Sequence, residues 1–302
     1  MNAITDEYSH NFTQQLSKWC HEHNVFYTGH IIEDMGCHFG TGCSSGHFFK
    51  SMRGADYASV DTVFNQIKPY YQNNDHLSLI ERGYSDNKFF SYTLCKLASS
   101  CAVQSESAKG RALCEIFGAY GWGESISDML YLANHAAISG INNFIPHAFS
   151  MNLYDTDCPP YFNGEGLNTS YEGYKKLFKY LSYLGKFSHK SYARVAVYYN
   201  ADSAWSNSIL YSIDDVAMQL MQHQIEFDFI DFDNIKRATV NNRVLKINSC
   251  EYDLLIIPNG NLSEETSDII NGLNIDKIIA NNDSFTLSIV GLVPSISYPS
   301  IS

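Results

Sequence analysis

Residues 112–149 read ALCEIFGAYGWGESISDMLYLANHAAISGINNFIPHAF. An apolar run ends at Glu115, a loop rich in glycine and aromatic residues follows, and Ser125 or Ser127 can cap the next helix. The apolar face of that helix consists of Met129, Leu132, Ala133 and Ala136. Gly140 ends the helix, and residues 142–149 are typical of a strand. Strand, helix and strand in this order predict a βαβ unit with parallel strands.

The flanking sequence extends the pattern. Short apolar runs at residues 25–28 and 58–64 predict further strands, and residues 89–103 predict a helix. After residue 190 the alternation resumes, with expected strands at 194–199, 225–230, 253–258 and 276–280 and helices after Ser212 and from Glu264. Such alternation indicates an open doubly wound sheet, so we expect a domain boundary near residue 190.

The composition argues against a disordered, a nucleic-acid-binding and a membrane-spanning protein. The chain has 302 residues, 45% of them hydrophobic, which is enough for a sizeable core and excludes disorder. Lys and Arg number 20 against 32 Asp and Glu, for a net charge of −12, so we expect no nucleic-acid partner. No apolar run reaches about 18 residues, so we expect no membrane span.

The cysteines and the first residues bear on localisation. Eight cysteines occur without a CxxC pair, and residues 1–10 are polar and acidic, without the features of a signal peptide. We therefore expect a cytoplasmic protein with reduced thiols. The loop cluster Cys37, His38, Cys43 and His47 does not match the usual zinc spacings, so we predict no metal. Neither GxGxxG nor a P-loop is present, and we predict no cofactor.

Three predicted strands end in polar groups. Parallel α/β folds place active sites at the carboxyl ends of their strands. Glu115 follows an apolar run there, and a partly desolvated carboxylate suits acid–base or nucleophilic work. A structural carboxylate bonded to a neighbouring loop is equally compatible with the pattern. His30, followed by Glu33 and Asp34, and His147 could bind a hydroxyl or orient a carboxylate.

Two aromatic residues follow Glu115 in the loop. Tyr120 and Trp122 could form a platform for a sugar, or could pack over the rim of the sheet.

Four segments resemble the later half of a glycoside hydrolase TIM barrel of the α-L-rhamnosidase-like and β-galactosidase-like kind: Thr28-Gly29-His30 with Glu33, and residues 115–122, 140–150 and 157–162. In several such enzymes a glutamine-amidotransferase-like domain without its nucleophile follows the barrel. Here too the turn Pro258-Asn259-Gly260 after an apolar strand contains no cysteine. The resemblance covers about residues 10–285.

The resemblance implies an α/β chain in three parts. Residues 1–190 would form the C-terminal half of a (β/α)8 TIM barrel, about its last four β/α units. Residues 191–285 would form a class I glutamine-amidotransferase-like domain with a flavodoxin-like, doubly wound open sheet. Residues 286–302 would be an irregular tail. We thus expect the C-terminal part of such an enzyme, which can be inactive as a fragment.

The resemblance also implies chemistry by two carboxylates that flank a glycosidic bond, without a cofactor. Glu115, at the end of the seventh strand, would be nucleophile or general base, and Glu33, after the fifth, general acid. In retaining relatives the acid/base ends the fourth strand, which would lie before Met1. The implied substrate contacts are His30, Asp61, Tyr120, Trp122 and His147.

Two other functions stay open. One is a non-catalytic carbohydrate-binding or assembly module that lacks the acid/base, and the other is a metal-dependent hydrolase that uses the His/Cys loop. Whether residues 1–190 act as an enzyme or only bind carbohydrate, a half barrel exposes two strand edges and an apolar face. We therefore expect a homo-oligomer or association through these edges, besides a carbohydrate partner.

Overall fold

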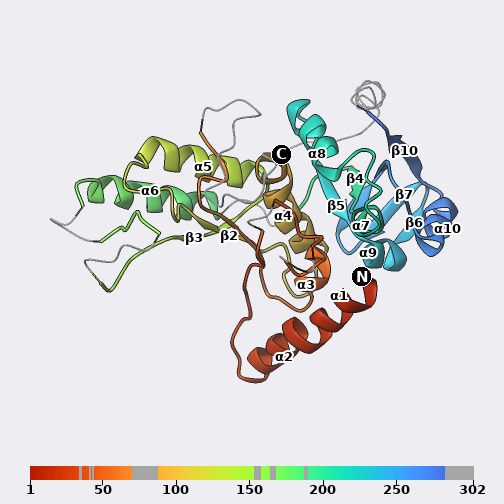
Figure 1. Ribbon diagram of the computed structural model, residues 1–302, viewed down its shortest axis with the longest axis horizontal. Helices are drawn as coiled ribbons and strands as arrows, with labels where there is room; N and C mark the ends of the chain where they lie inside the picture. Colours follow the sequence, from red (N-terminus) through yellow and green to blue (C-terminus); the bar gives the residue numbers. More distant parts are fainter. Residues whose placement is uncertain are drawn as a thin grey trace.

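The computed structural model (Figure 1) describes residues 1–33, 36–40, 42, 44–69, 88–152, 158–163, 168–186 and 190–282. Its architecture is mixed α/β with two parallel sheets. The first sheet has the order β1 (Ala58–Thr62), β2 (Ala112–Ile116), β3 (Asn143–Pro146). The second has the order β10 (Asp276–Ala280), β9 (Leu254–Pro258), β4 (Val195–Tyr198), β5 (Phe227–Ile230).

The first sheet presents different chemistry on its two faces. Side chains alternate along a strand, so one face carries the apolar residues Ala58, Val60, Ala112, Cys114 and Ile116. These share a core with three helices, α4 (Leu94–Gln104), α5 (Ile126–Ile138) and α6 (Tyr171–Leu184). The other face carries Ser59, Asp61, Leu113 and Glu115. Parallel register sets Asp61 beside Glu115, and Glu115 beside Ile145 of β3.

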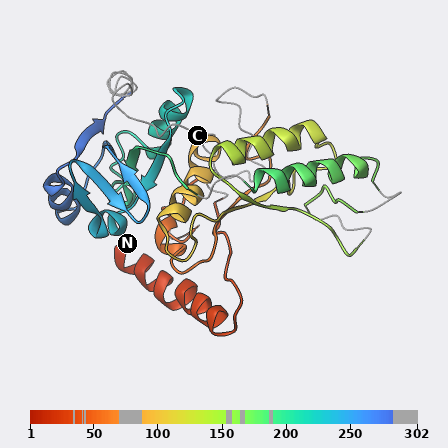
Figure 2. The ribbon, with the colours of Figure 1, turned by 180° about the vertical axis from the view of Figure 1, so that it is seen from behind.

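Helix α5 connects β2 to β3 as the sequence predicts. Ser125 is its cap: the Ser125 hydroxyl accepts the Asp128 N–H, and the Asp128 carboxylate accepts the Ser125 N–H. Gly140 ends the connection with a φ of +96°, which favours glycine. Helices α5 and α6 lie side by side, as both views show (Figures 1 and 2). The predicted βαβ unit is therefore confirmed.

The second sheet is covered on both faces, and its strands β4, β5 and β9 are buried along their whole length. Alternate residues of its strands face α4 and α8 (Ile213–Gln222) on one side. The others face α9 (Phe232–Arg237), α10 (Glu264–Gly272) and an antiparallel meander on the other side. The meander consists of β6 (Thr239–Asn241), β7 (Val244–Ile247) and β8 (Cys250–Tyr252). Counted along the chain, the parallel strands are ordered 2-1-3-4, as in flavodoxin-like sheets.

Helix α4 lies between the two sheets (Figure 1) and contacts β1, β2 and β5. All its residues except Val103 are buried. Polar side chains fix its contact with β5: the Ser100 hydroxyl accepts the Phe229 N–H at 2.9 Å, and the Gln104 amide donates to the Phe229 carbonyl at 2.6 Å. One apolar core therefore continues from the first sheet to the second.

The strand expected at residues 25–28 does not form. This segment runs extended beside β1, where the Asp56 N–H donates to the Tyr27 carbonyl at 2.9 Å and the Thr28 and Ser59 hydroxyls lie 2.6 Å apart. Further along, the Asp61 N–H donates to the Glu33 carboxylate rather than to a neighbouring strand. Side chains thus replace the ladder, and the described part of the first sheet has three strands, not four.

The sequence analysis also missed short elements. They are α1 (Asn2–Tyr8), α3 (Phe48–Ser51), α7 (Ala201–Trp205), α9 and the meander. The β6–β7 turn did carry a signal in the sequence, the pair Asn241-Asn242. Asn242 and Arg243 both adopt positive φ, as a two-residue hairpin turn requires. Helix α1 continues through a π-helical turn, Ser9–Thr13, into α2 (Gln14–Glu22). No described helix is long and apolar enough to cross a membrane. Five of the described cysteines are free thiols: Cys20, Cys95, Cys101, Cys114 and Cys250.

A buried lysine tests the contact between α4 and the second sheet. The Lys96 ammonium lies 2.7 Å from Glu226 and 3.9 Å from buried Asp228. We expect Lys96→Met to lower the free energy of unfolding by about 3 kcal/mol, because it leaves the Asp228 charge without its cation. The control Lys175→Met removes an exposed pair with Glu172 and should cost about 0.5 kcal/mol or less. Urea unfolding at pH 7 measures both, and equal small losses would contradict the role of Lys96.

Candidate functional site

Strand ends bring together Asp61, Glu115 and His147. Asp61 and Glu115 are register partners one residue before the ends of β1 and β2, on the face away from α4. His147 directly follows β3, and its N–H donates to the Ile116 carbonyl at 2.9 Å. The three side chains therefore meet at the carboxyl edge of a parallel sheet, where α/β proteins place their ligands.

The backbone turns sharply after Glu115. Phe117 and Ala119 have φ values of +82° and +58°, which non-glycine residues rarely adopt. Gly118 lies against the imidazole of His147, since a Cβ at this position would be 3.0 Å from its Cγ. His147 Nδ1 is 3.1 Å from Glu115 Oε1. The turn thus lets His147 approach and fix the Glu115 carboxylate.

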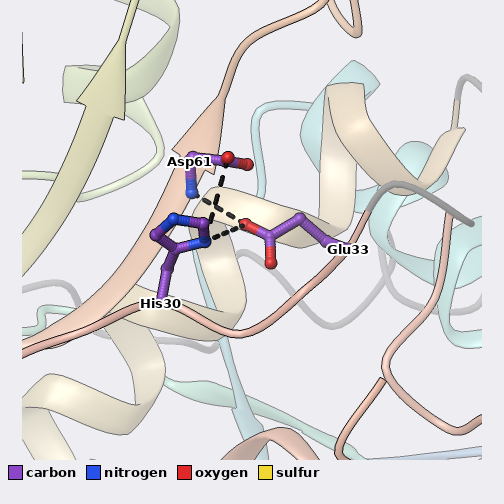
Figure 3. A group of neighbouring side chains, drawn as sticks. All are labelled: His30, Glu33 and Asp61. Carbon is purple, nitrogen blue, oxygen red and sulfur yellow. Dashed lines mark hydrogen bonds and ion pairs between the residues drawn. The ribbon is translucent and has the colours of Figure 1, made fainter. Parts of the chain in front are cut away.

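His30 bridges this pair to a second set of carboxylates. Its Nδ1 lies 3.7 Å from Glu33 Oε1 and 3.8 Å from Asp61 Oδ2. Its Nε2 lies 3.7 Å from Glu115 Oε2. Figure 3 shows the ring of His30 directed between Glu33 and Asp61. The extended segment that replaces the predicted strand therefore inserts one imidazole among three carboxylates.

Glu33 is buried and ionised. Burial by itself would raise its pKa, but the neighbouring imidazoles of His30 and His38 lower the pKa to about 2. Its Oε1 also accepts the Asp61 N–H at 2.8 Å, and its Oε2 lies 3.5 Å from His38 Nε2. The side chain is only 1% exposed. A general acid needs a proton and access to substrate, and Glu33 has neither, so the geometry does not favour the general-acid role expected from the sequence.

His30 carries the opposite charge. The contact with Glu33, with the charges of Glu33, Asp61 and Glu115, outweighs desolvation and raises the pKa of His30 to about 9. The imidazole is 36% exposed and lines a cavity of about 400 Å³. The other lining residues are Tyr8, Ile31, Ile32, Gly42, Ser44 and Ser45. His30 thus lies between the carboxylate cluster and this cavity, whose lining does not include Glu115.

The two aromatic residues expected to contact substrate lie on the turn after β2. The Tyr120 hydroxyl donates to the Ile67 carbonyl at 2.8 Å, so its proton is already used in a hydrogen bond within the protein. Trp122 is 63% exposed and contacts the Tyr161 ring edge to face, with centroids 5.9 Å apart. Five of the seven predicted residues are therefore linked by contacts, and Tyr120 and Trp122 stand apart from that set.

The sequence analysis predicted no metal site, but three side chains of this cluster have the residue types and spacing of metal ligands. Among the described residues, His30, Glu33 and Asp61 offer ligand atoms within 4.8 Å of one another. The pKa of His30 is raised to about 9, chiefly by its contact with Glu33, so at neutral pH a cation would compete with a proton for this imidazole. In the His/Cys loop, His38 faces Glu33 and His47 accepts the Lys50 N–H at the start of α3.

Some expectations fall outside the described residues. They concern Asp34, Cys43, Asp157 and the tail, residues 286–302.

Glu124 was missed by the sequence analysis. It follows Trp122 in the loop, and neither of its carboxylate oxygens, both buried, has a hydrogen-bond partner. Burial, with the nearby charge of Asp128, raises the pKa of Glu124 to about 9. Glu124 therefore carries a proton at neutral pH. No sequence pattern distinguishes it, because its burial arises from the fold of the loop.

Comparison with known proteins gives a likeness to solved structures. No protein-family model and no curated protein matches the chain. A solved structure, the rhamnosidase from Novosphingobium sp. PP1Y, is similar to it with a TM-score of 0.58 and 12% sequence identity. The match covers 96% of this chain but only 27% of the rhamnosidase chain. At this identity the likeness concerns the fold alone.

The pKa of Glu124 gives a pH-dependent prediction. A carboxyl whose pKa rises on folding costs stability as pH rises above its unfolded pKa of 4.5, until the folded value of about 9 is reached. We expect Glu124→Gln to match the wild type near pH 4 and to be more stable near pH 8. Thermal unfolding at the two pH values measures this. The control Glu172→Gln, on the exposed side of α6, should keep the wild-type pH dependence. Parallel curves for Glu124→Gln and wild type would contradict the burial of Glu124.

The approach of His147 to Gly118 gives a second prediction. We expect Gly118→Ala to destabilise the fold by about 1–3 kcal/mol, because the added methyl crowds the imidazole. Gly123→Ala is the control in the same loop, since nothing lies within 4 Å of its Cβ position. Chemical denaturation of the two variants measures the difference. Equal stability would show that His147 is free to move away.

Proposed function

We propose that this chain carries a glycoside-hydrolase-like site that acts on O-glycosidic bonds. The observation that supports it best is Glu115, a partly exposed carboxylate at the end of a parallel strand, held between the imidazoles of His147 and His30. A carboxylate fixed in this way can act as a nucleophile or as a general base toward water. The structural neighbour, a rhamnosidase, is in keeping with such a substrate.

The arrangement of the two sheets supports a matching proposal for the fold. We propose that residues 1–190 correspond to the C-terminal half of a (β/α)8 barrel and residues 191–285 to a glutamine-amidotransferase-like domain. Helices share a core with one face of β1–β3 while Asp61 and Glu115 occupy the other, as in a barrel wall. The 2-1-3-4 order of the second sheet supports the second assignment.

The positions of the side chains assign roles in this reaction. His147 Nδ1, at 3.1 Å from Glu115 Oε1, orients the carboxylate, and His30 Nε2 lies 3.7 Å from its other oxygen. The Glu115 carboxylate can attack the anomeric carbon or take a proton from water. Exposed Trp122, on the turn that follows Glu115, is the proposed platform for the sugar.

A variant of Glu115 tests the proposal. We expect the wild type to hydrolyse at least one aryl glycoside in a panel of rhamnosides, galactosides and glucosides. Glu115→Gln should lower kcat/KM by about 10²–10⁴-fold, because the reacting oxygen is lost, with the melting temperature nearly unchanged. Glu172→Gln, remote on α6, is the control and should keep full activity.

Two outcomes would contradict the proposal. Full activity of Glu115→Gln would make Glu115 a structural residue. No cleavage of any glycoside by the wild type, with sugar binding retained, would instead favour a non-catalytic carbohydrate-binding module.

A further inference from the structure

A cavity of about 520 Å³ lies apart from the Glu115 site, where the chain leaves the carboxyl end of β5. Its walls come from the end of α3 with the residues after it, from the C-terminal part of α4 with the loop that follows, and from α9 with its cap. None of the described lining residues belongs to the proposed glycoside site. The carboxyl ends of parallel strands are where α/β proteins place their ligands, so this cavity is a second candidate site.

We propose that this cavity binds a small zwitterion of the α-amino-acid type, with its ammonium group on Asp231 and its carboxylate on Arg237. The inference goes beyond the proposed glycosidase function and does not depend on it, because the two sites share no residue. It assigns a ligand to the second part of the chain, where the sequence analysis predicted no site residue.

Asp231 is a buried carboxylate without a cationic partner. It is 2% exposed, and one of its oxygens accepts the Asn234 N–H at 3.0 Å as the cap of α9. No described cation forms an ion pair with it, since the two arginines of the cavity, Arg53 and Arg237, face other carboxylates. Burial and the charge of Asp233 raise the pKa of Asp231 to about 6. A ligand ammonium would supply the positive charge that the protein does not place beside this carboxylate.

Asp231, Asn234 and Arg237 form a row along one face of α9. Residues three apart lie on the same face of a helix, about 4.5 Å apart along its axis, and all three line the cavity. The row therefore presents a carboxylate, an amide and a guanidinium in this order. A zwitterion that lies along the row meets an opposite charge at each end, whereas a simple cation or anion meets one favourable and one unfavourable group.

Hydrogen bonds hold this row in place. The Asn234 amide donates to Gln104 Oε1 at 2.8 Å and accepts from Arg237 Nε at 2.8 Å. A second nitrogen of Arg237, Nη2, donates to the Gln104 carbonyl. The third nitrogen, Nη1, lies 3.9 Å from the exposed carboxylate of Glu106, beyond hydrogen-bond distance. Nη1 can therefore exchange this loose contact for a ligand carboxylate without a change in the rest of the row.

Part of the cavity wall is apolar. Phe49, Met52 and Cys101 line it and are at most 6% exposed. An apolar side chain of the ligand can be buried against them while its ammonium and carboxylate groups stay on α9. We therefore expect a preference for apolar amino acids, with leucine bound more tightly than glycine.

Ligand binding to the full chain tests the proposal. A thermal-shift screen of the standard amino acids at pH 7.5 should find an apolar member that raises the melting temperature, because it binds the folded state alone. Calorimetric titration should then show saturable binding of leucine. The analogues 4-methylpentanoate and 3-methylbutylamine, which each lack one of its two charges, should bind about 10-fold more weakly or worse. No binding of any amino acid, or equal binding of either analogue, would overturn the proposal.

Substitutions on α9 locate the site. Asp231→Asn removes the charge but keeps a side chain that caps helices as well as aspartate does, so α9 should still form. It should weaken leucine binding by about 10-fold or more, and Arg237→Gln should do the same at the other end of the row. The control Lys236→Gln changes the neighbouring residue, which pairs with Glu265 outside the cavity, and should bind as the wild type does.

Two results with these variants would contradict the assignment. Wild-type affinity in Asp231→Asn and in Arg237→Gln would show that leucine binds elsewhere and that Asp231 serves only as the cap of α9. An equal loss of affinity in Lys236→Gln would show a general effect of charge on α9 in place of a contact in the cavity. Circular dichroism of each variant checks that the loss of binding is not a loss of fold.

Discussion

Helix α4 is the constraint on which the other parts of this molecule depend. It is buried almost along its whole length, with the first sheet on one side and β5 on the other. Since the apolar residues of β1 and β2 must face α4, the alternation of side chains sends Asp61 and Glu115 to the opposite face. The position of the candidate site thus follows from the packing of one helix.

Electrostatics then organises the site. Imidazoles and carboxylates alternate from His38 through Glu33, His30 and Glu115 to His147. A carboxylate as buried as Glu33 would be costly by itself, and it is stabilised because two imidazoles and a backbone N–H share its charge. The same contacts charge His30. Burial and charge in this cluster therefore determine each other, and the loss of one member changes the protonation of its neighbours.

Much of the regular structure could be predicted from the sequence, because periodicity and caps are local signals. Ser125 and Ser212 both form capping boxes, and Glu115 and His147 lie at strand ends as expected. The segment before His30 could not be predicted, because its strand propensity is overridden when the Asp56 carboxylate takes the Tyr27 N–H. The charges of Glu33, His30 and Glu124 depend on burial and on distant neighbours, which a single sequence does not contain.

The central claim is that the cluster around Glu115 and His30 binds a glycoside at its reacting bond. A crystal structure with a monosaccharide iminosugar, whose cationic ring mimics the charge of the transition state, tests it most directly. The account predicts the ring nitrogen at hydrogen-bond distance from Glu115 with His30 beside the anomeric position. Binding elsewhere, for instance in the cavity of about 520 Å³ beside Arg53 and Asp231, with the Glu115 site empty, would contradict it.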